Sequence, residues 1–288
     1  MDAHTLDNGT LKATVKSAGA ELVRLDFLGR PLLWGGDPAV WGRHAPHLFP
    51  FVGKLRDDAL TVDGRTAKMG QHGFARDRDW SWETRDGAAC RLALRDDEAS
   101  RAAYPFAFRL AVGYTLSGGT LRCDYELSNT GDRPLPASLG AHPGFVWPLP
   151  GNDDRTAHRL LFDQPETEGV RRLQGGLLDP KRYDSPVVDR VLRLDDRLFA
   201  TDAIIFDRPA SASVQYGAPG APTLTVAWEN FPHLGIWSKP GAGFLCIEPW
   251  QGHSGSADDP PEFKDKPGTV TLAPGESRRF AWCVTVEA

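Results

Sequence analysis

Hydrophobic and polar residues alternate along much of this chain. In residues 106–116, FAFRLAVGYTL, an apolar side chain stands at every second position from Phe106 to Leu116. After a turn at 117–119 (SGG), residues 121–127 repeat the same alternation. A period of two is typical of strands with one buried face, so this stretch predicts an antiparallel β-hairpin.

Similar patterns recur on either side of this hairpin. A second hairpin is predicted between WSWET and CRLAL, which flank Asp86 and Gly87, and a closing strand runs from Phe280 to Val286. Helical signals are weak. Residues 96–106 (DDEASRAAYPF) predict a turn or two of helix that a proline near the end would stop.

The turn residues define the predicted fold class. With 30 glycines and 23 prolines in 288 residues, the chain is cut into many short strands. This composition favours an all-β protein, a large sandwich or barrel of antiparallel strands. All-β folds often exceed 200 residues as one unit, and no repeat or linker divides this chain. The loop at 148–155 (PLPGNDDR) need not separate domains, so we predict a single domain over residues 1–288.

Charge and cysteine usage narrow the function classes. The formal net charge is −5, which does not suggest nucleic acid or an anionic membrane as a partner. The four cysteines are far apart and form no CxxC pair, as is usual in a reducing compartment. The N-terminus lacks a signal-peptide pattern, and no run of about 18 apolar residues is present. We therefore expect a cytoplasmic protein without a membrane span.

Four polar residues stand in unusual surroundings. His142 lies in GAHPGF, where proline and glycine predict a bend, and His72 lies between glycines in GQHGFAR. Glu248 ends the apolar run FLCIEPW, and a buried glutamate is costly unless it is paired or functional. Arg56 follows the apolar stretch PFVGK. Each residue also has a purely structural interpretation. The two histidines could be hydrogen-bonded residues of turns. Glu248 could be the first exposed residue after a core strand, and Arg56 could be a surface arginine.

A metal site is a competing hypothesis. His44 and His47 form an HxxH pair, a spacing that would supply two ligands from one face of a helix. Pro46 and Pro50 argue against a helix there, and no acidic ligand is nearby in sequence. We therefore predict no metal.

Two further groups of residues are candidates for other chemistry. The loop QGHSGSADD offers His253, Ser254 and Asp258, but it lacks the GxSxG elbow of a hydrolase. Trp237 and Trp250 are candidates for stacking on sugar rings, although most of the nine tryptophans are expected in the core.

Taken together, these motifs resemble a known family. Chiefly β chains with HG early, HPxF in the middle and EPW late are similar to the aldose 1-epimerases, or galactose mutarotases. The segments GQHGFARDRDW, GIWSKPGAGFLCIEPWQG and VTLAPGESRRFAWCVTV resemble its bacterial branch of uncharacterised sugar epimerases. The resemblance implies the galactose mutarotase-like supersandwich, a large antiparallel β-sandwich whose open groove holds one sugar.

The resemblance also implies roles for individual residues. Glu248 would be the general base and His142 the general acid. His72 and Arg56 would bind the sugar, although VGKLR departs from the asparagine-and-arginine pattern of the better-known galactose enzymes. Asp202 in TDAIIF would contact sugar hydroxyls, with Asp207 in FDRP as the rival.

The implied reaction interconverts the α and β anomers of an aldose. A base removes the proton of the C1 hydroxyl while an acid protonates the ring oxygen; the ring opens, rotates about C1–C2 and recloses. One acid and one base on either side of the anomeric centre suffice, without a cofactor or metal. We expect a monosaccharide as the partner and a monomer or homodimer.

Two alternatives stay open. One is a mutarotase for hexose 6-phosphates, in which Arg43, Arg56 and Arg76 would supply a phosphate pocket. The other is a non-catalytic sugar-binding module on the same fold, which need not keep both His142 and Glu248.

Overall fold

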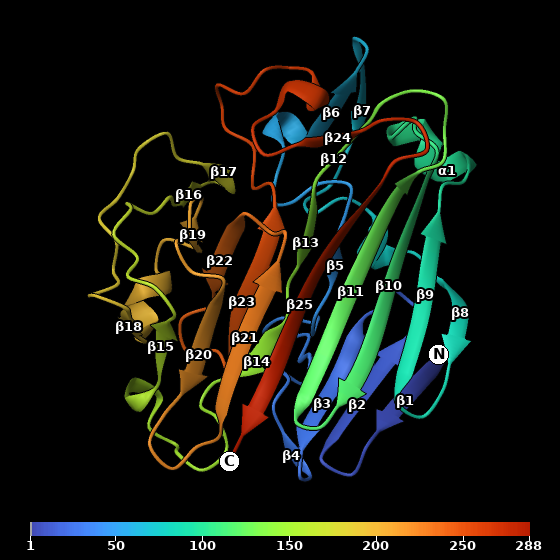
Figure 1. The fold of residues 1–288 in the computed structure, drawn as a ribbon. Coiled ribbons are helices and arrows are strands. Elements are labelled where there is room, and N and C mark those ends of the chain that lie inside the picture. The colour runs from blue at the N-terminus through green and yellow to red at the C-terminus, as the bar shows by residue number, and fades with distance from the viewer. Residues whose placement is uncertain (1) are drawn as a thin grey trace.

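β-Strands make up almost all of the regular structure in the computed structural model, which describes residues 2–288 (Figure 1). The one α-helix among these residues is α1 (Glu98–Ala103), so the predicted short helix is confirmed. A capping box begins it: the Ser100 N–H donates to the Asp97 carboxylate, and the Asp97 N–H donates to Ser100 Oγ. Within residues 2–288, no helix is long and apolar enough to cross a membrane.

The largest sheet has nine antiparallel strands in the order β18-β15-β20-β21-β25-β11-β10-β9-β8. Their bounds are β8 (Ser81–Arg85), β9 (Ala89–Arg95), β10 (Phe108–Ser117), β11 (Thr120–Asn129), β15 (Arg159–Phe162), β18 (Val191–Arg193), β20 (Ser213–Gly217), β21 (Thr223–Glu229) and β25 (Ser277–Glu287). β10 pairs with β11, and β8 pairs with β9. Both predicted hairpins are therefore confirmed, and the predicted closing strand lies within β25.

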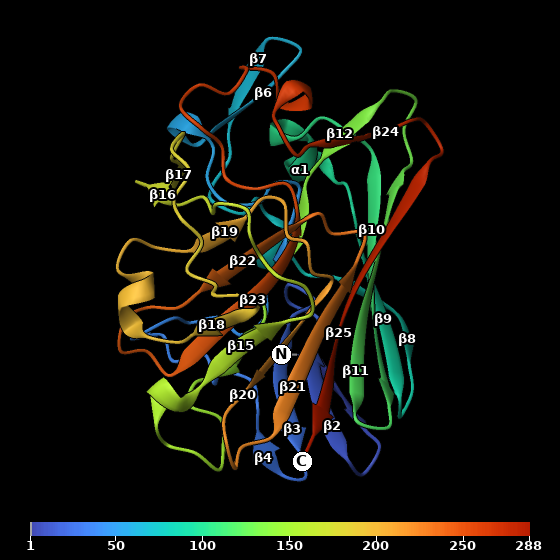
Figure 2. The ribbon, with the colours of Figure 1, turned by 60° about the vertical axis from the view of Figure 1, so that its left-hand side comes forward.

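A second sheet of six strands crosses behind the first. Its order is β19-β22-β23-β13-β5, and β14 also pairs with β23. The bounds are β5 (His47–Leu48), β13 (Leu139–Ala141), β14 (Gly144–Val146), β19 (Ile204–Phe206), β22 (His233–Trp237) and β23 (Phe244–Gln251). In Figure 2, β22 and β23 lie to one side of β25, β11 and β10.

The remaining elements are short. A four-stranded sheet comprises β1 (Ala3–Asp7), β2 (Leu11–Lys16), β3 (Leu22–Phe27) and β4 (Arg30–Pro31). Two-stranded pairs comprise β6 (Ala59–Val62) with β7 (Arg65–Lys68), β12 (Leu135–Ala137) with β24 (Val270–Leu272), and β16 (Leu173–Gln174) with β17 (Leu177–Leu178). The 3₁₀ turns are η1 (Arg56–Asp58), η2 (Ala75–Asp77), η3 (Arg155–Ala157), η4 (Asp196–Phe199) and η5 (Phe263–Asp265).

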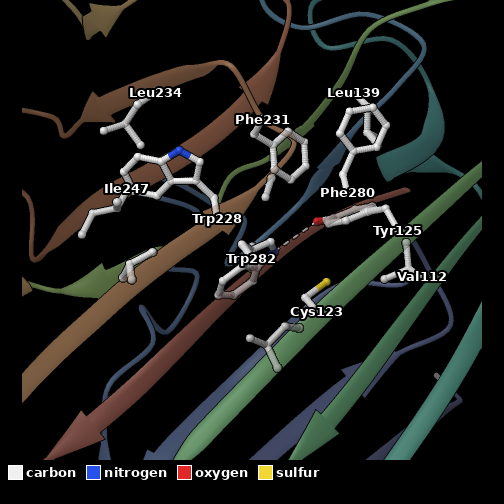
Figure 3. Close-up of a cluster of buried hydrophobic side chains, with 14 of the residues drawn as sticks. Val112, Cys123, Tyr125, Leu139, Trp228, Phe231, Leu234, Ile247, Phe280 and Trp282 are labelled. Carbon is white, nitrogen blue, oxygen red and sulfur yellow. Dashed lines mark hydrogen bonds between the residues drawn. The ribbon is translucent and has the colours of Figure 1, made fainter. Parts of the chain in front are cut away.

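The main core lies between the nine-stranded sheet and the other sheets. In Figure 3, the indole of Trp228 lies beside Leu234 of β22 and Ile247 of β23, and Trp282 lies near Tyr125 and Cys123. The Trp282 indole N–H donates to the Tyr125 hydroxyl at 3.2 Å, which satisfies a buried donor. Two sheets thus pack face to face, as the predicted antiparallel β-sandwich requires.

Candidate active site

β23 carries Glu248 on the face that points away from the main core. Because side chains alternate along a strand, Leu245 and Ile247 enter that core from one face. The opposite face carries Phe244, Cys246, Glu248 and Trp250. Glu248 is only 1% exposed. The interpretation of this glutamate as the first exposed residue after a core strand is therefore wrong.

The strand that faces Glu248 is interrupted at His142. Gly140 of β13 pairs with Trp250, and Gly144 of β14 pairs with Cys246. His142 is midway between the two glycines, so the register places it opposite Glu248. The distance from His142 Nε2 to Glu248 Oε2 is 3.3 Å. Proline at 143, which has no N–H, explains why regular pairing breaks beside the histidine.

The two glycines of GAHPGF make room for indole rings. A Cβ on Gly140 would lie 2.6 Å from Cδ1 of Trp250, and a Cβ on Gly144 would lie 2.8 Å from Cζ3 of Trp41. Trp41 stacks on the His142 imidazole, with ring centroids 5.0 Å apart and planes inclined by 28°. The glycines therefore allow tryptophans to approach the backbone closely on each side of His142.

His72 reaches the same place from a separate turn. The Gly53 N–H donates to His72 Nδ1 at 3.0 Å, so the neutral ring carries its proton on Nε2. The His72 backbone is left-handed, at φ 66°, and the adjacent Gly73 packs against the Phe49 carbonyl. The imidazoles of His72 and His142 meet edge to face, with centroids 5.6 Å apart.

Two arginines supply the positive charge beside these histidines. Burial and the charges of Arg76 and Arg43 lower the pKa of both His72 and His142. Burial, and then repulsion by Arg43, lowers the pKa of Arg76 itself to about 10. Arg43 pairs with Asp77 at 2.6 Å, whereas Nε of Arg76 is buried and has no hydrogen-bond partner in the described part of the chain.

Arg56 lies elsewhere. Its side chain is exposed, and Nη1 donates to the Ala257 carbonyl oxygen at 2.7 Å. The structure therefore does not bring Arg56 to the two histidines, and it does bring Arg76 and Arg43 there.

The two candidate aspartates have different surroundings. Asp207 accepts hydrogen bonds from both terminal nitrogens of Arg182, at 3.0 and 2.7 Å. Asp202 is exposed, accepts a hydrogen bond from the Ala203 N–H, and its charge raises the pKa of Glu248. Asp202 is thus the aspartate whose charge reaches Glu248, while Asp207 is held in an ion pair.

Burial controls the protonation of the facing pair. It raises the pKa of Glu248 well above its usual range, and the Asp202 charge acts in the same direction. Burial, followed by the charge of Arg76, lowers the pKa of His142 to about 3. Burial therefore disfavours the charged form of each group.

The residues of the HxxH pair and of the QGHSGSADD loop have structural roles. His47 is fully engaged: Nδ1 bonds the Tyr125 hydroxyl, and Nε2 bonds the Tyr114 hydroxyl, each at 2.9 Å. Neither nitrogen is left for a metal. Ser254 Oγ accepts a hydrogen bond from the Lys54 N–H, and His253 contacts the Ser254 carbonyl oxygen instead of its hydroxyl.

Comparison with known proteins identifies the family. Residues 2–282 match the family described as aldose 1-epimerase. The chain belongs to the aldose 1-epimerase family. The predicted resemblance is therefore confirmed.

Three proteins similar to this aldose 1-epimerase family member come from Lactococcus and Lactobacillus. It is 29% identical to the plasmid-encoded protein LacX of Lactococcus lactis subsp. lactis, with 98% of each chain covered. A galactose mutarotase related enzyme from Lactobacillus acidophilus superposes with a TM-score of 0.95 at 30% identity, covering 100% of this chain and 98% of the other. A galactose mutarotase-like protein from Lactobacillus casei superposes with a TM-score of 0.92 at 29% identity, covering 99% of this chain and 100% of the other.

Sequence reasoning missed one residue of the site and gave too little weight to two. Trp41 has no distinguishing pattern around it, and in the sequence Cys246 is one more residue of the apolar run before Glu248. Arg76 is four residues after His72 in GQHGFAR and was considered only for phosphate. Its place in this motif was the one signal that set it apart from other arginines.

Proposed function

We propose that this member of the aldose 1-epimerase family is a mutarotase that interconverts the α and β anomers of an aldose. The observation that supports this most directly is the contact between His142 and Glu248. The hydroxyl oxygen and the ring oxygen of an aldose are bonded to the same carbon, C1. An acid and a base that serve these two oxygens must therefore be close neighbours, and 3.3 Å between Nε2 and Oε2 meets this requirement.

One proton shared by His142 and Glu248 is enough for the reaction. The reactive form has the proton on His142, the form that burial disfavours in the free protein. From it, the Glu248 carboxylate takes the proton from O1 while the imidazolium gives its proton to the ring oxygen. The ring opens, and the pair now holds its proton on Glu248. After rotation about C1–C2, the same transfers run in reverse on the other face of the aldehyde. The pair carries one proton before and after, so no net charge is added to a buried site.

Neighbouring groups are suited to holding the sugar. The Nε2–H of His72 and the guanidinium of Arg76 can donate to hydroxyl or ring oxygens, and the Asp202 carboxylate can accept from hydroxyls. Trp41 and Trp237 contact the His142 ring and offer apolar faces to a sugar. We assign the arginine contact to Arg76 in place of Arg56.

Polarimetry of freshly dissolved α-D-glucose and α-D-galactose tests the proposal. The purified protein should accelerate the change in optical rotation. Glu248→Gln and His142→Asn should each lower kcat by about 10²–10⁴. His4→Asn, which changes a histidine at the start of the chain, is the matched control and should keep full activity. If neither sugar, nor any other common aldose or hexose 6-phosphate, reacts faster than in buffer, the protein is a binding module and the proposal fails.

A phosphorylated aldose is the second candidate substrate, and the two arginines beside the histidines favour it. Guanidinium groups bind phosphate through paired hydrogen bonds, and Arg76 keeps a buried N–H without a partner among residues 2–288. For such an enzyme, kcat/KM for glucose 6-phosphate should exceed that for glucose. Arg76→Gln should then reduce kcat/KM for the phosphorylated sugar more than for glucose. Equal losses for both sugars would favour the neutral substrate.

We also propose a cytoplasmic location. All four cysteines are free thiols, and three of them are buried. Unpaired thiols are ordinary in a reducing compartment and uncommon in secreted chains. Fractionation of the source cells, followed by immunoblotting, tests this; recovery from the medium or envelope would contradict it.

A further inference from the structure

A thiol completes a group of metal ligands around the proposed acid and base. His142, Cys246 and Glu248 each offer a ligand atom, and these atoms all lie within 4.8 Å of one another. All three residues are buried, at 7%, 0% and 1% exposure. Oε2 of Glu248 has no hydrogen-bond partner in residues 2–288, so a lone pair is available to a ligand.

We propose that His142, Cys246 and Glu248 bind a zinc ion and that the bound ion blocks the site. Imidazole nitrogen, thiolate sulfur and carboxylate oxygen are the ligand types that zinc takes in proteins. A site with three protein ligands leaves a fourth position for water or a hydroxyl. Alkaline-earth ions, which prefer oxygen ligands alone, would not select this group.

The spacing of the ligand atoms fits zinc. Two ligands at about 2.0–2.1 Å from a tetrahedral zinc ion are about 3.3 Å apart. This is the distance from His142 Nε2 to Glu248 Oε2. Sulfur, at about 2.3 Å from the metal, needs to be about 3.6 Å from each of them. The Cys246 sulfur lies within 4.8 Å of both in the metal-free site. Register explains the arrangement: Cys246 and Glu248 share one face of β23, and His142 lies opposite.

The exchange of charge is balanced. Zn²⁺ is bound by a thiolate, a carboxylate and a neutral imidazole, so binding releases to solvent whatever protons the ligand atoms carry. The two negative ligands cancel the charge of the ion. The complex is therefore neutral, and an aromatic environment containing Phe244 and Trp41 tolerates it.

Bound zinc would stop the mutarotase reaction. It occupies the lone pairs of His142 and Glu248 that the reaction uses for proton transfer. This consequence depends on the proposed function, whereas zinc binding itself does not. The ion is therefore an inhibitor and has no part in the reaction.

Zinc binding is measured first, on the full chain after treatment with EDTA. Competition with a chromogenic zinc chelator should give one tight site per chain. Substitution with Co²⁺ should give tetrahedral d–d bands and a thiolate-to-cobalt charge-transfer band. Cys246→Ala should remove that band and weaken zinc binding at least about 100-fold, more than the loss of an outer-shell partner costs. Cys246→Ser, which keeps the side-chain size, should behave in the same direction.

Cys283→Ala is the matched control, because Cys283 is a half-buried thiol on β25 of the other sheet. It should bind zinc and cobalt as the wild-type protein does. Equal zinc affinity in the wild-type protein and Cys246→Ala, or a cobalt spectrum without the thiolate band, would overturn the inference.

Activity is measured separately. Zinc should slow mutarotation by the wild-type protein, and EDTA should restore the rate. The rate of each protein is expressed relative to its own rate without zinc. On that scale, Cys246→Ala should need at least tenfold more zinc than the wild-type protein for the same inhibition. If the metal-free protein shows no mutarotation, the proposed function fails while the binding and spectral results still decide the zinc site.

Discussion

Replacement of Gly140 by alanine tests whether this glycine is required by packing. Gly140 is in β13, pairs with Trp250, and its backbone is buried. A Cβ at this position would lie 2.6 Å from Trp250 Cδ1, 3.1 Å from Leu48 Cδ1 and 3.2 Å from Val52 Cγ2. Carbon atoms in contact prefer separations of about 3.5–4.0 Å, so the indole has to move by roughly 1 Å.

The surroundings of Trp250 leave little room for that movement. On its other side the ring lies against Gly235, where a Cβ would be 2.3 Å from Trp250 Cη2. Extra groups in well-packed cores cost about 1–3 kcal/mol, and a ring confined on both sides should fall in the upper half of that range. For a protein of this size, about 2–3 kcal/mol corresponds to a Tm lower by roughly 4–10 °C.

The measurement is urea unfolding at constant pH together with thermal unfolding by circular dichroism. Gly87→Ala is the matched control: its added Cβ would meet open space, and its φ is not positive. This control should change the free energy of unfolding by less than about 0.5 kcal/mol. The cost of Gly140→Ala should also shrink in a Trp250→Leu background, because the two residues are in contact. If Gly140→Ala and Gly87→Ala unfold at the same temperature, the packing argument is refuted.

Three other predictions concern pH, sugar binding and stacking. Burial lowers the pKa of His47 from 6.5 to about 4, so the unfolded chain takes up this proton first as pH falls and stability is lost below about pH 6.5. Between pH 7 and pH 5, His47 should lower the free energy of unfolding of the wild-type protein by about 1.8 kcal/mol. In urea unfolding, His47→Gln should show a fall in this free energy that is smaller by the same amount; equal falls would contradict the pKa assignment. Asp202→Asn should raise KM roughly 10–100-fold at unchanged Tm, whereas Asp207→Asn should lower Tm at unchanged KM, and the reverse pattern would favour Asp207 as the sugar ligand. Trp41→Leu should reduce kcat/KM by roughly 2–10-fold through loss of the stacked ring, and Trp82→Leu, on the far edge of the nine-stranded sheet, should not; equal effects would argue against a role for stacking.

The sequence by itself determined two hairpins, the closing strand and most of the candidate site residues. Alternation with period two is a local property, so the hairpins β10–β11 and β8–β9 could be read directly. The apolar run that ends at Glu248 and the glycine-flanked His72 and His142 also stood out locally. The resemblance to the family depends on the order of these motifs along the chain, so it could be recognised without knowing which residues are in contact.

The tertiary structure decided which of these residues meet. Glu248 and His142 are separated by about a hundred residues, and only the pairing of β13 and β14 with β23 places them opposite one another. Arg56 and Arg76 each follow a motif that the sequence singles out, but the path of the chain leaves Arg56 at the surface and brings Arg76 to the histidines. The physical reason is that a local pattern fixes which face of a strand is apolar, whereas the choice of neighbouring strand depends on packing over the whole sandwich.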